Sequence, residues 1–165
     1  RDTDRSRGLG DVYKRQLLEF VKISEEDAAL QFSPITVCLI VVKIGKDYLM
    51  GFNHWRKGWE IFGGCPEKGE TMRETMIRET KEELGIDCIP EWLGLAHFEM
   101  QPDYFSNVVR EEYGAIFGVS LGEEYLEQIE KLRIDREEIE KIALLGEISS
   151  DEEIRELDRK LIEFY

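Results

Sequence analysis

Apolar and polar residues alternate along the chain with two different periods, and each period predicts its own kind of secondary structure. Ile35–Ile44 is an almost continuous apolar run rich in β-branched residues, which is typical of a central strand buried on both faces. Shorter apolar stretches predict further strands at 17–23, 48–53, 88–100 and 108–120. Polar and glycine-containing segments separate the strands, and the first of these predicts a turn at 24–27.

Two helices are predicted with defined ends. Thr71 and Glu74 form a capping-box pattern, and Gly85 is a stop signal for the helix that this box opens at about residue 72. A second capping-box pattern at 150–153 predicts a C-terminal helix that reaches about residue 164. Its apolar residues recur at the helical period and form one stripe that faces the core: Ile154, Leu157, Leu161 and Phe164.

The remaining segments complete an α/β pattern. A short helix is predicted at 123–132, and the segment 138–145 favours a strand over a helix. Strands followed by one helix in the middle of the chain and another at its end predict a sandwich of helices around a sheet.

The N-terminal segment 1–16 is predicted to be foreign to the protein. Residues 6–16, SRGLGDVYKRQ, resemble the one-frame translation of a transposase-type sequencing-library adapter, and residues 1–5 fit the primer and index ahead of it. The alternative is a basic N-terminal tail. With this segment set aside, 17–165 has the length of a single domain with one core.

Net charge, apolar run length and cysteine content indicate the binding partners and the cellular compartment to which the protein is suited. The formal net charge of −14 disfavours binding to nucleic acid or to an anionic membrane. The longest apolar run, 37–42, is too short to cross a bilayer. The three cysteines form no C-x-x-C pair, which indicates a reducing compartment and predicts a cytoplasmic protein.

The most specific pattern lies between residues 64 and 86. It reads as G-x5-E-x7-R-E-x-x-E-E-x-G, with seven positions defined by identity: Gly64, Glu70, Arg78, Glu79, Glu82, Glu83 and Gly85. The last three glutamates are spaced i, i+3, i+4, so they share one face of the predicted helix. A solvated helix face would explain the glutamates alone, but it does not explain the fixed offsets of the glycines, the arginine and Glu70.

This group of residues predicts a metal site. Three carboxylates on one face repel one another unless a cation lies among them, and hard oxygen ligands favour Mg²⁺ or Mn²⁺. Arg78 is expected to pair with Glu70 across the loop and to hold Glu79 in place. Ile77 and Leu84 are expected to anchor the opposite side of the helix to the core.

The stretch resembles the signature of the Nudix hydrolases, with Thr80 and Phe62 as departures from the residues usual there. The resemblance implies a Nudix-type α/β/α sandwich with a mixed β-sheet between helices, and a single Nudix domain with its Nudix box at 64–86. It also implies hydrolysis of a pyrophosphate bond in a nucleoside diphosphate joined to another group. The ligands of Mg²⁺, or of Mn²⁺, would be Glu79, Glu82, Glu83 and the carbonyl of Gly63.

The same resemblance suggests further site residues. Glu79 is one candidate for the general base, and Glu112 or Glu111 in a later segment is the other. Trp55 and Tyr113 are candidates for stacking on a base, and Arg56 for contact with a substrate phosphate. Each of these has a plainer alternative, namely a core aromatic or an exposed charge.

The substrate is the least defined part of the prediction. A nucleoside triphosphate, including oxidised guanine nucleotides, is favoured over ADP-ribose or a nucleotide sugar, for which Pro102 is a weak marker. The alternative to an enzyme is a Nudix-fold binding module without catalytic activity. Such modules usually lack some of the motif glutamates, whereas all of them are present in this chain. The expected partner is a small nucleotide, and a homodimer is left open.

Overall fold

One 8-stranded mixed sheet runs through the molecule in the order β1-β6-β7-β2-β3-β4, with β5 paired to β2 and β8 paired to β3. The computed structural model describes residues 15–102 and 106–165. The strands are β1 (Arg15–Val21), β2 (Ile35–Ile44), β3 (Asp47–Asn53), β4 (Gly58–Glu60), β5 (Phe62–Gly64), β6 (Glu91–Met100), β7 (Arg110–Leu121) and β8 (Ile139–Leu144). Among these strands β2 and β7 run parallel, and the other pairs run antiparallel.

β2 is buried on both faces because its alternate side chains enter two different cores. Cys38, Ile40, Val42 and Ile44 belong to the first core, which also contains residues of the helix α3 (Met72–Leu84). Val37, Leu39 and Val41 belong to the second core, which contains Leu157 and Leu161 of the helix α5 (Glu156–Ile162). The continuous apolar run in the sequence follows from this double burial.

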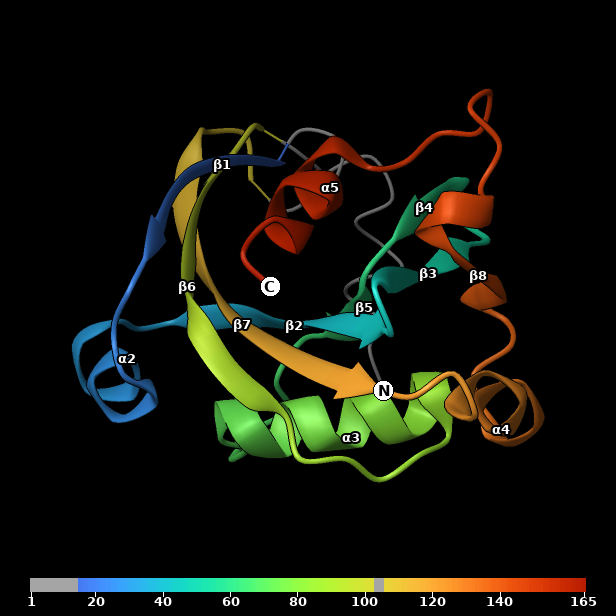
Figure 1. The fold of residues 1–165 in the computed structure, drawn as a ribbon. Helices are drawn as coiled ribbons and strands as arrows, with labels where there is room; N and C mark the ends of the chain where they lie inside the picture. Colours follow the sequence, from blue (N-terminus) through green and yellow to red (C-terminus); the bar gives the residue numbers. More distant parts are fainter. Residues whose placement is uncertain (1–14, 103–105) are drawn as a thin grey trace.

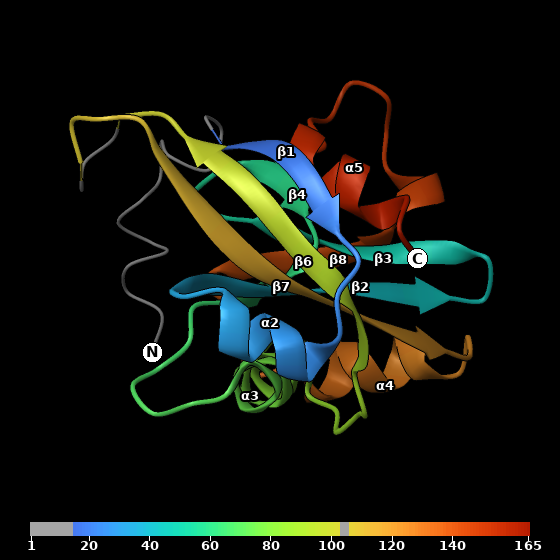
Figure 2. The same cartoon turned by 90° about the vertical axis from the view of Figure 1, so that its left-hand side faces the viewer.

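The helices form two layers around the sheet (Figures 1 and 2). α3 lies on one face together with α2 (Glu25–Gln31) and α4 (Tyr125–Leu132), and α5 lies on the other. A 3-10 turn, Leu145–Glu147, follows β8. The predicted α/β/α sandwich with a mixed sheet is therefore confirmed.

β2 and β3 diverge beyond their hairpin end, and the segment 58–64, which contains β4 and β5, lies between them. β2 and β3 pair at their hairpin end, from Ile44↔Asp47 to Val42↔Leu49. Beyond that point β4 pairs with β3, and β5 pairs with the first half of β2. The segment before α5 lies on the outer side of β4, where Trp59 and Ile154 form an isolated parallel bridge.

Three local predictions were wrong. The expected turn at 24–27 is instead the start of α2, in which the Ser24 side chain accepts a hydrogen bond from the Asp27 amide. The predicted capping box at 150–153 does not open α5, since that helix begins at Glu156, after the bridge of Ile154 to Trp59. Ile77 is 43% exposed and does not anchor α3 to the core, whereas Leu84 is fully buried as expected.

The N-terminal segment is described only from Arg15 onward. Residues 1–14, most of the stretch that resembles an adapter, lie outside the described residues. Arg15 and Gln16 open β1 and pair with Met100 and Glu99 of β6. The foreign origin of 1–16 therefore stays a prediction. Within the described part of the chain, each helix is too short or too polar to cross a bilayer.

Candidate active site

Two glycines of β5 allow the backbone and a carboxylate to approach closely. Gly63 has φ +147°, and a Cβ added to it would lie 2.1 Å from the carbonyl oxygen of Cys38. A Cβ on Gly64 would lie 2.3 Å from Oε1 of Glu79. These contacts are shorter than any side chain tolerates, so glycine at 63 and 64 lets β5 lie directly against β2 and beneath Glu79.

α3 carries the glutamates and is fixed at both ends. Its capping box is formed as predicted, since the Thr71 and Glu74 side chains each bind the other residue's amide. Gly85 ends the helix in the left-handed conformation with φ 72°, and a Cβ there would lie 2.2 Å from the backbone of Leu132. The sequence therefore defines both ends of this helix by local signals.

Glu79 and Glu83 lie on the inner side of α3. They are one helical turn apart and are 3% and 1% exposed, whereas the Glu82 side chain is 29% exposed. Buried carboxylates need hydrogen bonds or opposite charge around them. For Glu83 one such bond comes from the Gly63 amide, which donates to its Oε1 at 2.8 Å.

Arg78 binds the carboxylates around the loop. Its Nε and Nη2 donate to the two oxygens of Glu70 at 2.7 and 3.0 Å, and its Nη1 donates to Oε2 of Glu79 at 2.6 Å. Nη2 also donates to the carbonyl of Cys65, and Nη1 lies 3.8 Å from Oε1 of Glu82. The predicted pairing of Arg78 with Glu70 and its hold on Glu79 are thus confirmed.

The pairing keeps Glu70 ionised to lower pH than an unpaired glutamate. Hydrogen bonds from Arg78 lower the pKa of the Glu70 carboxyl from 4.5 to about 2. Because this carboxylate stays ionised throughout the neutral range, the Glu70–Arg78 fork is a constant support for Glu79. Behind the loop, burial raises the pKa of the Cys38 thiol to about 12, so this residue is an inert core side chain.

Two further carboxylates, from outside α3, lie close to Glu83. Asp135 and Glu138 come from the segment between α4 and β8, and both are buried. One carboxylate oxygen from each of Glu83, Asp135 and Glu138 lies within 4.8 Å of the other two. The sequence did not single out Asp135 or Glu138 as site residues.

Backbone hydrogen bonds fix the segment that carries this pair. The amides of Ile134 and Asp135 both donate to the carbonyl of Glu82, at 3.0 and 2.8 Å, and so bind the last turn of α3. The buried guanidinium of Arg133 donates to the carbonyls of Ile139 and Glu140 at 2.7 and 3.1 Å. The segment is therefore attached both to the C-terminal end of α3 and to the start of β8.

The donor set fits a hard divalent cation. Glu83, Asp135 and Glu138 form the close group of carboxylates, and Glu79, one turn before Glu83 on α3, is a buried carboxylate outside that group. Mg²⁺ and Mn²⁺ prefer such oxygen ligands. The residues present therefore fit the metal that the sequence predicts.

Comparison with known proteins identifies the family. A model of the NUDIX domain matches residues 35–164, which is most of the chain and includes the whole motif on α3. The chain belongs to the Nudix family. Its enzyme class is that of a Nudix pyrophosphohydrolase, as the sequence predicted. No curated protein matches the sequence.

Solved Nudix structures share the fold at low sequence identity. A Bacillus subtilis pyrophosphohydrolase, BsRppH, is 16% identical with a TM-score of 0.59, and the match covers 91% of this chain and 88% of that one. A MutT protein from Methanosarcina mazei is 19% identical with a TM-score of 0.56, over 78% of this chain and 90% of that one. A Nudix hydrolase from Nitrosomonas europaea is 20% identical with the same TM-score, over 81% and 88%. At these identities the likeness concerns the fold.

Arg56 lies in the interior of this Nudix domain and not at its surface. Its side chain is fully buried, and its Nη2 lies 2.8 Å from Glu60 and 3.3 Å from Glu138. The sequence predicted that Arg56 contacts a substrate phosphate. A guanidinium committed to two buried carboxylates does not suit that role.

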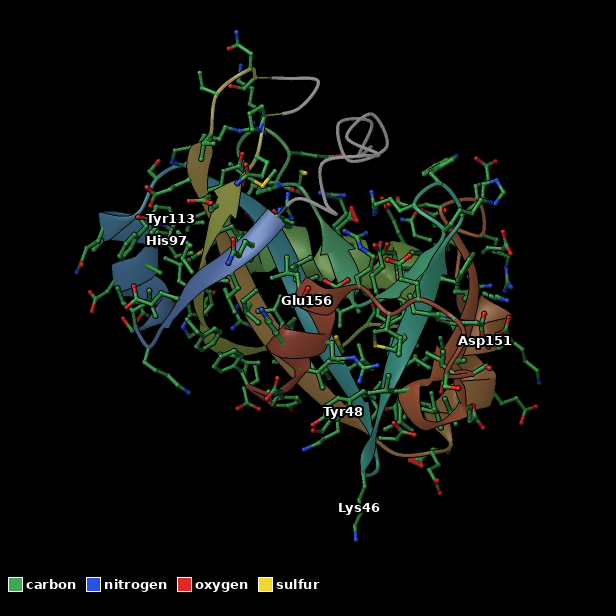
Figure 3. All side chains as sticks on the ribbon, turned by 90° about the horizontal axis from the view of Figure 1, so that it is seen from above. Lys46, Tyr48, His97, Tyr113, Asp151 and Glu156 are labelled. Carbon is green, nitrogen blue, oxygen red and sulfur yellow. The ribbon has the colours of Figure 1, made fainter. Side chains whose placement is uncertain are left out.

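The two predicted stacking residues differ in their surroundings. Tyr113 stacks on His97, with 4.8 Å between ring centroids and an interplanar angle of 14°, and its ring lies 4.9 Å from that of Phe32. Figure 3 shows His97 and Tyr113 side by side next to α2. Trp55 is half-buried, and its amide donates to Oδ1 of Asn53. A role in base stacking stays a prediction for Trp55, whereas Tyr113 already has aromatic neighbours in the protein.

Glu112 and Glu111, the alternatives for the general base, lie at the start of β7. Glu112 accepts hydrogen bonds from Thr36 at 2.7 Å and from Arg110 at 2.9 Å. The Glu111 side chain is 60% exposed, and its Oε1 lies 2.5 Å from Nε2 of His97. Their part in catalysis, like the use of the Gly63 carbonyl as a metal ligand, stays a prediction.

Proposed function

We propose that this Nudix protein is a Mg²⁺-dependent hydrolase, active with Mn²⁺ as well, that cleaves the pyrophosphate bond of a nucleoside diphosphate-linked substrate. A nucleoside triphosphate, oxidised forms included, is the substrate we favour. The observation that carries the proposal is the buried pair Glu79 and Glu83. Arg78 and the Gly63 amide each bind one of them, and the additional carboxylates Asp135 and Glu138 lie beside Glu83.

The chemistry requires such an arrangement. When bound, the divalent cation neutralises the adjacent phosphates and lowers the pKa of a bound water. Glu79, Glu82 and Glu83 would hold the cation from α3, and Arg78, which donates to Glu79, would keep that carboxylate aligned. Glu79, or Glu112 or Glu111 at the start of β7, takes the proton of the attacking water. The products are a nucleoside monophosphate and the remaining phosphorylated group.

The cellular location and the binding partner are proposed from the cysteines and the charge of the chain. The three cysteines of the chain are free thiols, which supports a reducing and hence cytoplasmic location. The acidic charge supports a small nucleotide as the partner, without nucleic acid or membrane.

A substrate panel with and without metal tests the proposal. The panel contains nucleoside triphosphates, ADP-ribose, diadenosine polyphosphates and nucleotide sugars, each incubated with Mg²⁺ and with EDTA. We expect release of a nucleoside monophosphate from at least one substrate in Mg²⁺ and none in EDTA. If only ADP-ribose or nucleotide sugars are cleaved, that class of compound replaces the nucleoside triphosphate as the proposed substrate. If no compound is cleaved, the result favours the inactive binding module.

Two matched variants test the site itself. Glu83→Gln removes one charge from the buried group, and we expect activity to fall by at least about 100-fold. Glu74→Gln makes the same change at an exposed position of α3, where glutamine can still complete the capping box, and activity is expected to be retained. Undiminished activity of Glu83→Gln would refute the ligand assignment. Glu79→Gln, Glu111→Gln and Glu112→Gln, compared over a range of pH, distinguish the candidates for the base.

A further inference from the structure

The turn between β3 and β4 holds Arg56 in a fixed position next to the metal site. The side-chain oxygen of Asn53 accepts hydrogen bonds from the amides of Trp55 and Arg56, at 3.0 and 2.9 Å. The Lys57 amide donates to the carbonyl of Asn53 at 2.8 Å, and Lys57 adopts a positive φ of 55°. The backbone from which the Arg56 side chain extends is therefore well defined.

From this turn, two side chains bind the same oxygen of Glu138. Nη2 of Arg56 and Nδ2 of Asn53 each lie 3.3 Å from Oε2 of Glu138. Both groups also bind Glu60, and Arg56 does so with two nitrogens, Nε to Oε2 at 3.1 Å and Nη2 to Oε1 at 2.8 Å. Glu60 thus orients the guanidinium, and the guanidinium reaches on to Glu138.

Glu138 connects this turn with the carboxylates at the end of α3. Its amide donates to Oδ1 of Asp135 at 3.0 Å, and its carbonyl accepts from the amide of His54 at 2.8 Å. Its carboxylate lies with those of Asp135 and Glu83 in the group described above. Three carboxylates this close repel one another, and a glutamate side chain has enough rotatable bonds to turn away unless it is held.

We propose that Arg56, assisted by Asn53, is a positioning residue that holds Glu138 toward Glu83, so that the metal affinity of the site depends on Arg56. A planar guanidinium suits this task because it binds Glu60 through Nε and Nη2, and Nη2, which carries two hydrogens, also reaches Glu138. The inference rests on the proposed function, since it assumes that a divalent cation binds at Glu83.

Binding of Mn²⁺ in the absence of substrate tests the inference without relying on turnover. The dissociation constant is measured by electron paramagnetic resonance for the whole chain and for Arg56→Met. We expect binding to weaken about 10-fold, as is usual when a partner of a metal ligand is removed. Arg155→Met is the control, because Arg155 is also a buried arginine and pairs with Glu60 at 3.3 Å. Its Mn²⁺ affinity is expected to stay within about 2-fold of the wild type.

A double-mutant cycle separates positioning from a general loss of structure. If Arg56 acts through Glu138, Arg56→Met will weaken Mn²⁺ binding much less in a Glu138→Gln background than in the wild type. If Arg56→Met does not fold, Arg56→Lys takes its place in the Mn²⁺-binding measurement. It keeps the buried charge but lacks the planar fork, so we expect weaker Mn²⁺ binding at near-normal thermal stability.

The outcomes distinguish this inference from the proposed function. Equal Mn²⁺ affinities of the Arg56 and Arg155 variants, or fully additive effects in the cycle, would overturn the positioning role while wild-type binding still supports the metal site. Failure of the wild type to bind Mn²⁺, or binding unaffected by Glu83→Gln, would overturn the proposed function itself.

Discussion

Gly64→Ala is the substitution for which the structure predicts the most specific effect. The added Cβ would lie 2.3 Å from Oε1 and 2.5 Å from Cδ of Glu79, and ordinary contact begins at 3.4 Å. The Glu79 carboxylate must therefore move by about 1 Å, which strains its bond to Arg78. A displacement of about 1 Å in a catalytic group costs about 100-fold in rate. The displaced atoms end a flexible side chain, so the fold is expected to survive.

Gly63→Ala is the matched comparison, because a methyl group added at residue 63 would clash with the backbone of β2 and not with the end of a flexible side chain. Its Cβ would lie 2.1 Å from the carbonyl of Cys38, at a residue with φ +147°. Relief there requires β5 to separate from β2, so we expect this variant to unfold or to lose several kcal/mol of stability.

Steady-state hydrolysis and thermal unfolding followed by circular dichroism distinguish the two cases. Gly64→Ala should show a melting temperature within about 5 °C of the wild type and a kcat reduced about 100-fold. Full activity in Gly64→Ala would show that the position of Glu79 is not critical. A folded and active Gly63→Ala would refute the close approach of β5 to β2.

Three further results are expected. Since the pKa of Glu70 is lowered to about 2 in the folded protein, its pairing stabilises the fold above pH 4.5 and is lost as pH falls toward 2. The difference in unfolding free energy between wild type and Glu70→Gln should therefore be about 1 kcal/mol at pH 7 and vanish near pH 2 in urea titrations. Thr71→Ala should destabilise the protein by about 1 kcal/mol, because it removes the cap of α3. Mg²⁺ at ten times its dissociation constant should stabilise the wild type by about 1.4 kcal/mol and stabilise Glu83→Gln far less, measured by thermal shift against EDTA.

Elements whose signals are local could be predicted from the sequence. α3 runs from Met72 to Leu84 as expected, because a capping box and a glycine stop lie at its ends. β2 runs from Ile35 to Ile44 because its residues suit burial on both faces. The pairing of Arg78 with Glu70 could also be inferred, since Glu70 lies just before α3 and Arg78 lies in its second turn.

The features that the sequence did not predict depend on tertiary contacts. A capping box is present in the sequence at 150–153, but Ile154 pairs with Trp59 and keeps the chain extended before α5. Asp135 and Glu138 lie among several other glutamates, and no local signal separates them from solvated charges. Backbone hydrogen bonds, among them those of their segment to the Glu82 carbonyl, bring them to Glu83. Arg56 resembled an exposed cation because its two partners are four and 82 residues away.

The bridge between Trp59 and Ile154 has a consequence for how copies of the protein meet. An uncovered strand offers a row of backbone donors and acceptors that can recruit a strand from another molecule. On the outer side of β4 the Trp59 amide donates to the carbonyl of Glu153, and the Trp59 carbonyl accepts from the amide of Arg155, both at 2.9 Å. The segment that leads into α5 therefore acts as a shield against aggregation at this end of the sheet.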